Sequence, residues 1–123
     1  MENKTIRFSY NWNNKLDNKA FTTIRLHNPN KYIVGNEYNV EINGKQKGVA
    51  FLQDKRTLGI NQLNDFICYL DTGYNKQQTI GMLQRMYKNM NIQTALFDFC
   101  LLVYSKPEKQ ATKVMQTSLE LYP

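Results

Sequence analysis

The sequence predicts an α+β domain with about five or six largely antiparallel strands and two helices inserted before the last central strand. Three observations support this fold class. An Asn-Gly pair joins two extended runs, the apolar spacing becomes helical from residue 60 onward, and a nearly continuous apolar run returns at Leu96–Tyr104. The chain has 123 residues, enough for one domain with a core. We expect this domain at residues 1–106 and a tail with weak helical character at 107–123.

The first third of the chain alternates between extended runs and short turns. Thr5–Tyr10 has an apolar residue at every second position, which predicts a half-buried strand. Asn11–Asn18 carries two apolar side chains four positions apart and predicts one or two helical turns. Lys19–His27 alternates again, stops at the turn-forming Asn28–Asn30, and is followed by a brief extended segment, Lys31–Val34.

The clearest local pattern is a β-hairpin near residue 43. Tyr38–Ile42 alternates apolar and polar side chains, and Gln46–Lys55 is again extended in character. Asn43 and Gly44 lie between these runs and predict a type I′ turn, because both turn positions need positive φ angles that Asn and Gly adopt readily.

Two helices are predicted between the hairpin and the last strand. Asn61 can cap the first helix and Gly73 can end it, while Asn75 and Gln78 form a capping-box pattern for the second. The apolar stripe of the first helix comprises Ile60, Leu63, Ile67 and Leu70, with Phe66 beside it. The apolar side of the second helix comprises Ile80, Leu83, Met86 and Tyr87. We interpret its methionines as core residues.

The last apolar run, Leu96–Tyr104, is interrupted only by Asp98 and predicts a central strand buried on both faces. Cys68 and Cys100 each lie in an apolar run, so we expect both to be reduced core residues. Two distant cysteines and the single histidine, His27, do not make a zinc site. The sequence therefore predicts no structural metal and no cofactor.

The charge balance favours an anionic partner. Sixteen Lys and Arg residues against ten Asp and Glu residues give a net charge of +6, and nucleic acid is the commonest partner of such a chain. The same charge can also serve solubility alone. No apolar run is long enough to span a bilayer and the N-terminus lacks a secretory pattern, which predicts a cytoplasmic protein with no membrane contact. We separately expect a monomer or a weak homodimer.

The candidate site lies on the predicted strand Lys19–His27. Strand alternation places Thr22, Ile24 and Leu26 on a face that we interpret as core. The opposite face carries Lys19, Phe21, Thr23, Arg25 and His27. Apart from the Phe21 ring, these residues supply an ammonium, a hydroxyl, a guanidinium and an imidazole. Such a face either lines a cleft or is the solvated side of a half-buried strand.

Enzyme motifs are scarce in the sequence. It has no Walker A loop, no Gly-rich dinucleotide turn, no His-Glu-x-x-His and no Gly-x-Ser-x-Gly. Asp71, Thr72 and Gly73 match the active-site triplet of aspartic proteases, which need two such carboxylates and therefore a dimer. Those enzymes carry the triplet near the start of the chain and on β-structure, whereas here it follows a helical stripe past the middle. We therefore do not adopt the protease reading.

Three features together resemble the ASCH domain of the PUA-like superfamily: Lys19 with Thr23-Ile24-Arg25, the Gly35–Val40 stretch, and the two-helix insert. The resemblance covers roughly Thr5–Tyr104. It implies a small PUA-like mixed or antiparallel β-barrel with helices at the rim and a cleft suited to RNA or a nucleoside. Some members of the family are amidohydrolases that remove acyl groups from N4 of acylated cytidine, and others are proposed RNA binders or ribonucleases.

The resemblance also implies roles for individual residues. Thr23 corresponds to the hydroxyl nucleophile, Arg25 to a group that binds phosphate or a base edge, and Asp71 to an acidic residue that activates water or shuttles a proton. Ala20 occupies the family's lysine position, and Lys19 one step earlier shares the face of Thr23 and could act as base or oxyanion stabiliser. Each of these residues could instead have a purely structural role. Arg25, for example, could be a surface charge paired with Asp71.

Four aromatic residues and one histidine complete the candidate site. They are Tyr10, Trp12, Phe21, Tyr74 and His27. A base can stack on such rings, and Trp12 is the first choice because it lies in a polar Asn-rich stretch, although it could equally be a lid on the core. The expected function is binding of RNA or a modified nucleoside, with hydrolysis of N4-acylcytidine as its enzymatic form. The alternative is a non-catalytic protein-interaction or accessory domain with a vestigial site.

Overall fold

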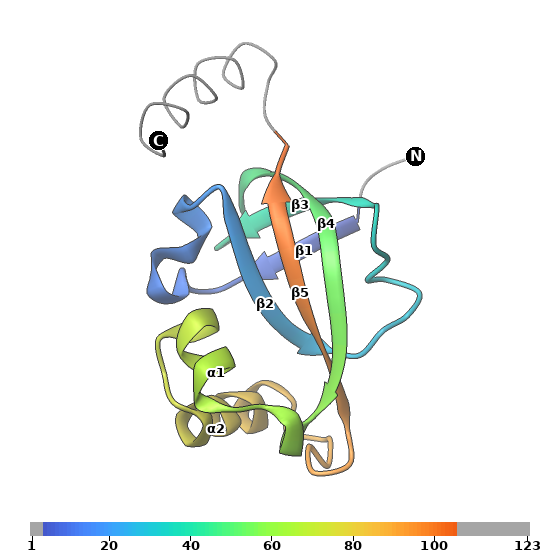
Figure 1. The fold of residues 1–123 in the computed structure, drawn as a ribbon. Helices are drawn as coiled ribbons and strands as arrows, with labels where there is room; N and C mark the ends of the chain where they lie inside the picture. Colours follow the sequence, from blue (N-terminus) through green and yellow to red (C-terminus); the bar gives the residue numbers. More distant parts are fainter. Residues whose placement is uncertain (1–3, 106–123) are drawn as a thin grey trace, which may run out of the picture.

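Five strands form one curled sheet in the order β1-β3-β4-β5-β2, with two helices at one end of it (Figure 1). The structure is a computed structural model that describes residues 4–105, so the predicted tail at 107–123 lies outside the described residues. β1 runs parallel to β3, and the other three strand pairs are antiparallel. The α+β class and the largely antiparallel sheet are therefore confirmed. The strands are β1 (Lys4–Phe8), β2 (Ala20–Leu26), β3 (Glu37–Ile42), β4 (Lys45–Gly59) and β5 (Leu96–Tyr104).

The predicted hairpin is present between β3 and β4. Asn43 and Gly44 form its turn with φ angles of 51° and 79°, as the type I′ pattern requires. The predicted extended segment Lys31–Val34 is a turn instead. The Tyr38 hydroxyl accepts a hydrogen bond from the Ile33 amide (2.8 Å) and donates one to the Lys31 carbonyl (2.7 Å). These backbone groups therefore bond to a side chain rather than to a neighbouring strand.

The first helix begins later than the sequence pattern indicated. A 3-10 turn, η2 (Ile60–Gln62), precedes helix α1 (Asp65–Thr72). Asn64 rather than Asn61 caps α1, because its side chain accepts a 2.8 Å hydrogen bond from the amide of Ile67. This start leaves Leu70 exposed rather than in the core. The end at Gly73 and the capping box of α2 (Lys76–Met86) are as predicted.

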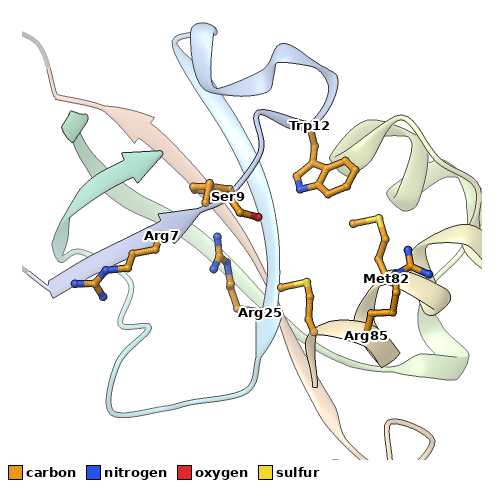
Figure 2. Close-up of a pocket in the computed structure, with 8 residues that line it drawn as sticks. Arg7, Ser9, Trp12, Arg25, Met82 and Arg85 are labelled. Atoms are coloured by element: carbon orange, nitrogen blue, oxygen red, sulfur yellow. The ribbon is translucent and has the colours of Figure 1, made fainter. Parts of the chain in front are cut away.

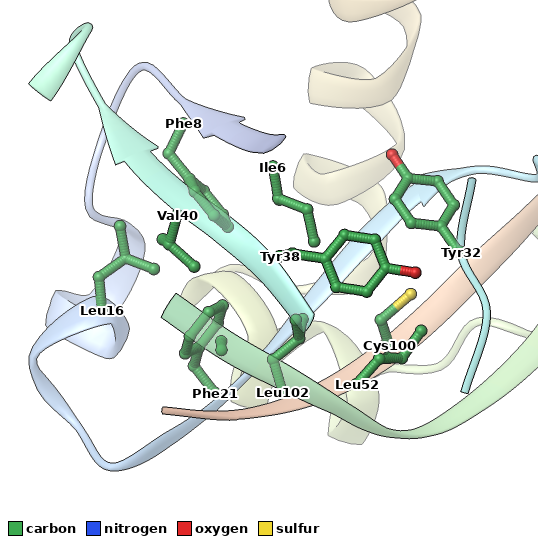
Figure 3. Close-up of a cluster of buried hydrophobic side chains, with 11 residues drawn as sticks. Ile6, Phe8, Leu16, Phe21, Tyr32, Tyr38, Val40, Leu52, Cys100 and Leu102 are labelled. Carbon is green, nitrogen blue, oxygen red and sulfur yellow. The ribbon is translucent and has the colours of Figure 1, made fainter. Parts of the chain in front are cut away.

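Two hydrophobic clusters lie on opposite sides of β2 and β5. The first fills the inside of the curl (Figure 3) and consists of Ile6, Phe8, Leu16, Phe21, Tyr32, Tyr38, Val40, Ala50, Leu52, Cys100 and Leu102. The second lies between the sheet and the helices and consists of Ile24, Ile60, Leu63, Cys68, Leu83, Ile92 and Phe97. β5 lies between β4 and β2, as predicted. Both cysteines are buried and free, also as predicted.

None of the helices within residues 4–105 is both long and apolar enough to cross a membrane.

Candidate functional site

A cavity of about 260 Å³ opens where the curled sheet brings its two edge strands toward α2. Figure 2 shows side chains from β1, β2 and α2 around it, together with Trp12 from the short 3-10 segment η1 (Trp12–Asp17). The lining residues are Arg7, Phe8, Ser9, Trp12, Arg25, Met82, Arg85 and Met86. Among these residues there are three guanidinium groups and no carboxylate. We call this space the arginine cavity.

A narrower hollow of about 40 Å³, which we call the inner hollow, shares several of these residues. It is large enough for about one water molecule. Lys15, Thr23, Asp71, Thr72 and Thr79 line it together with Phe8, Trp12 and Arg25. The inner hollow therefore places an amine, a carboxylate and hydroxyl groups beside the arginine cavity.

Lys15 and Asp71 form a buried ion pair in the inner hollow. Lys15 Nζ lies 3.0 Å from Asp71 Oδ1, and the two side chains are only 6% and 4% exposed. The Thr22 hydroxyl donates a 2.8 Å hydrogen bond to the same oxygen. Burial lowers the pKa of Lys15, the charge and hydrogen bond of Asp71 oppose this shift, and the nearby Arg25 guanidinium adds to it. The proton of Lys15 is thus easier to remove than that of an exposed lysine.

The local backbone of η1 allows Lys15 to reach inward. Asn13 and Asn14 have φ angles of 57° and 54° and interrupt the 3-10 segment. Asn tolerates this left-handed region better than most residues. The interruption lets Trp12 and Lys15 line the same hollow, while Leu16 enters the first hydrophobic cluster.

Arg25 is held by two contacts. Its Nε donates a 2.9 Å hydrogen bond to the Thr23 hydroxyl. Its guanidinium carbon lies 4.5 Å from the centroid of the Phe8 ring, at cation–π distance. The Thr23 hydroxyl oxygen accepts this hydrogen bond, so the bond does not involve the hydroxyl proton of Thr23. The pair fixes the direction of the guanidinium at the wall of the arginine cavity.

Trp12 is supported by two tyrosines. Its ring centroid lies 4.7 Å from that of Tyr10 and 5.5 Å from that of Tyr74, both in edge-on arrangements. Neither tyrosine is among the residues that line the cavity. The tyrosines therefore hold the Trp12 ring in place, and Trp12 itself contributes the aromatic surface of the site.

The structure brings four of the sequence-predicted site residues together: Thr23, Asp71, Arg25 and Trp12. Lys19 lies elsewhere, on an exposed hollow that it shares with Asp17 and Lys47. Lys15 and Arg7 were missed by sequence reasoning, as were three α2 residues, Met82, Arg85 and Met86.

Phe21 and His27 also lie outside both cavities. The Phe21 ring is in the first hydrophobic cluster, with its centroid 6.0 Å from that of Phe8. His27 Nδ1 lies 2.9 Å from Oδ1 of Asp98, which is fully buried. Burial would raise the pKa of Asp98, but hydrogen bonds from His27, the Asn28 amide and the Thr57 hydroxyl outweigh this effect and lower it. This cluster fastens the end of β2 to β4 and β5.

The part of the chain that the structure describes contains no group of three or more His, Cys, Asp or Glu side chains able to hold a metal ion. Comparison with protein-family models, with curated proteins and with solved structures found no match for this chain. The function is therefore inferred from the site alone.

Proposed function

We propose that this protein binds RNA or a modified nucleoside in the arginine cavity. One observation carries the proposal: three arginines and the single tryptophan of the chain line the same cavity. Arginine forks match phosphate oxygens and base edges, and an aromatic ring stacks on a base of any sequence. The net charge of +6 supports an anionic partner.

The proposal includes a PUA-like fold of the ASCH type. The curled five-stranded sheet and the helices at one of its ends support it. The residues of the resemblance also support it, because Thr23, Arg25 and Asp71 lie in the walls of one small hollow.

Trp12 provides a direct test of binding. As the only tryptophan, its fluorescence reports on the cavity without a label. Titration with short single-stranded RNA should change this fluorescence, and the affinity should fall steeply as salt is raised, because phosphate contacts release counterions. Arg25→Gln should weaken binding. Arg56→Gln, which removes the same charge from a side chain 74% exposed outside the cavity, should leave it nearly unchanged.

A second candidate function is hydrolysis of the N4-acyl amide of cytidine. The buried Lys15–Asp71 pair beside the Thr23 hydroxyl favours it. In this mechanism neutral Lys15 takes the Thr23 proton while the hydroxyl oxygen bonds to the acyl carbon. The bond from that carbon to N4 then breaks, and the proton passes from Lys15 to the leaving amine. Water finally cleaves the threonine ester, which releases the carboxylic acid and restores the hydroxyl.

Incubation with N4-acetylcytidine, followed by chromatography for cytidine, tests this activity. Turnover should be lost in Lys15→Met and Thr23→Val and kept in Lys19→Met, because Lys19 lies in a different hollow. Loss in Lys19→Met alone would return the catalytic role to that lysine. No turnover by the unsubstituted protein would remove the hydrolase and leave the binding proposal in place. A protein with neither turnover nor RNA binding would fit the non-catalytic interaction domain.

A further inference from the structure

We infer that the arginine cavity recognises a single nucleotide through its phosphate group, so that a phosphorylated nucleotide is bound in preference to the free nucleoside. This inference rests on the proposed function and narrows its ligand. The phosphate can belong to a free mononucleotide or to one unit of an RNA strand, and the experiment below distinguishes these sources.

The first support is an excess of positive charge around the cavity. Arg7, Arg25 and Arg85 line it. Lys31 lies close enough that burial, followed by the charges of Arg25, Arg7 and Lys4, lowers its pKa. Cations that repel one another in this way gain stability when an anion binds among them.

The nearby carboxylates do not cancel this charge. Asp71 in the inner hollow is already bonded to Lys15 and to the Thr22 hydroxyl. Glu41 Oε1 forms an ion pair with Nε of Arg7 at 3.4 Å, but the Arg7 side chain is 71% exposed, so water screens this pair and it offsets only part of the charge of one arginine. Among the described residues, Arg25 contacts the Thr23 hydroxyl and the Phe8 ring rather than a carboxylate, and Arg85 lies on the exposed side of α2. The cavity therefore keeps a net positive lining.

The second support is the fixed orientation of Arg25. A guanidinium has five N–H donors, and the bond to Thr23 uses only the one on Nε. The Phe8 ring 4.5 Å from the guanidinium carbon limits its rotation. The four donors on the two Nη atoms remain in the planar fork that binds phosphate oxygens in pairs, with little side-chain entropy left to lose.

The third support is the size and polarity of the cavity. Its volume of about 260 Å³ lies just below the roughly 300–1,000 Å³ usual for small-ligand pockets. It therefore suits one nucleotide unit rather than a helix. Trp12 and Met82 lie across the cavity from Arg25 and Arg7 (Figure 2). A base can thus contact Trp12 and Met82 while its phosphate faces Arg25 and Arg7.

The test is calorimetric titration of the full chain with four ligands: cytidine, cytidine 5′-monophosphate, inorganic phosphate, and oligocytidylate without terminal phosphates. We expect the monophosphate to bind at least about tenfold more tightly than cytidine, since charge-assisted hydrogen bonds are the stronger kind. Arg25→Gln should reduce this ratio to about twofold or less. Arg85→Gln, on an exposed helix position where folding is not at stake, should reduce it in part, and Arg56→Gln should preserve it.

The titration with oligocytidylate identifies the source of the phosphate. Oligocytidylate that binds as tightly as the monophosphate assigns the site to a strand diester, and weaker oligocytidylate binding assigns it to a free nucleotide. Equal affinity for cytidine and its monophosphate would overturn the inference and leave the proposed function standing. Absence of binding by all nucleosides, nucleotides and RNA would overturn both. Inorganic phosphate bound as tightly as the monophosphate would overturn the role of the base, and hence the inference.

Discussion

Lys15 and Asp71 show how a charged site is kept inside a small protein. Burial of an isolated charge is very costly, so such groups occur in pairs with further hydrogen bonds. Here one carboxylate oxygen serves both Lys15 Nζ at 3.0 Å and the Thr22 hydroxyl at 2.8 Å. The pair joins η1 to the end of α1 and places both groups in the inner hollow. The same two residues therefore determine local stability and the chemistry of the site.

Removal of one partner should be far more harmful than removal of both. Asp71→Asn leaves the Lys15 ammonium buried without its counter-charge and should lower the free energy of unfolding by about 3–5 kcal/mol. Lys15→Met should cost a similar amount, because it leaves the carboxylate buried. The double variant should lose clearly less than the sum. Urea unfolding of the four proteins measures these changes, and additive losses would show that the pair is not coupled.

At the residue scale, the sequence predicts which side chains carry reactive or binding groups better than it predicts what surrounds each side chain. Thr23, Arg25 and Asp71 follow from a short motif, and Trp12 from its isolation among polar residues. Phe21 shares a strand face with Thr23 and Arg25, but alternation does not say what covers that face. Here the curl of the sheet turns the Phe21 end of that face into the core. The position of Lys15 depends on two left-handed asparagines, which no hydrophobic period reveals.

At the scale of elements, the end of α1 controls how the helix meets η1. Gly73 has a φ angle of 83°, and a Cβ atom added there would lie 3.5 Å from the Asn13 side chain. Gly73→Ala should therefore destabilise the protein by about 1 kcal/mol, through backbone strain rather than a clash.

Gly81 in the interior of α2 offers the matched control. A Cβ atom there has only the end of the Arg85 side chain nearby, at 3.7 Å. Gly81→Ala should stabilise the protein by roughly 0.5–1 kcal/mol, because alanine is the better helix former. Thermal unfolding of both variants gives the comparison. A Gly73→Ala variant as stable as the parent would show that the left-handed cap is not needed.

Elements with their own local chemistry were predictable from sequence, and those defined by distant partners were not. The Asn43-Gly44 turn and the Asn75–Gln78 capping box each need only a few neighbouring residues. The parallel pairing of β1 with β3 depends on how the chain crosses the sheet, and no residue of either strand encodes it alone. The Ile60–Gln62 turn likewise could not be told apart from the helix in the sequence, because its residues continue the apolar spacing of α1.

At the scale of the whole molecule, protons on buried and partly buried tyrosines and cysteines make the fold sensitive to alkali. Burial raises the pKa of Tyr38 and Cys68 in this way, and the shift is larger at three further groups. Burial raises the pKa of Tyr32, Cys100 and Tyr104 to about 12 each. The unfolded chain releases these protons nearer pH 9 to 10, so between about pH 9 and 12 the folded state holds more of them and the free energy of unfolding falls as pH rises. Lys15 acts in the opposite direction, because its pKa is lowered on folding.

The alkaline loss can be measured as the urea midpoint between pH 8 and 11. Cys100→Ala removes one of the three groups and should make the decline shallower, whatever its effect at neutral pH. Tyr69→Phe, at a side chain that is 51% exposed, should leave the slope unchanged. An identical slope in the Cys100 variant would mean that this thiol does not contribute.

The strand order also has a consequence for the timing of synthesis. Within residues 4–105, β1 pairs with β3 alone and β2 pairs with β5 alone. The walls that carry Arg7, Trp12 and Arg25 are thus translated early, but β2 obtains its partner only once β5 has been made. The arginine cavity therefore cannot be completed on the ribosome until β5 has emerged, and a truncated product that ends before β5 leaves β2 without its partner strand.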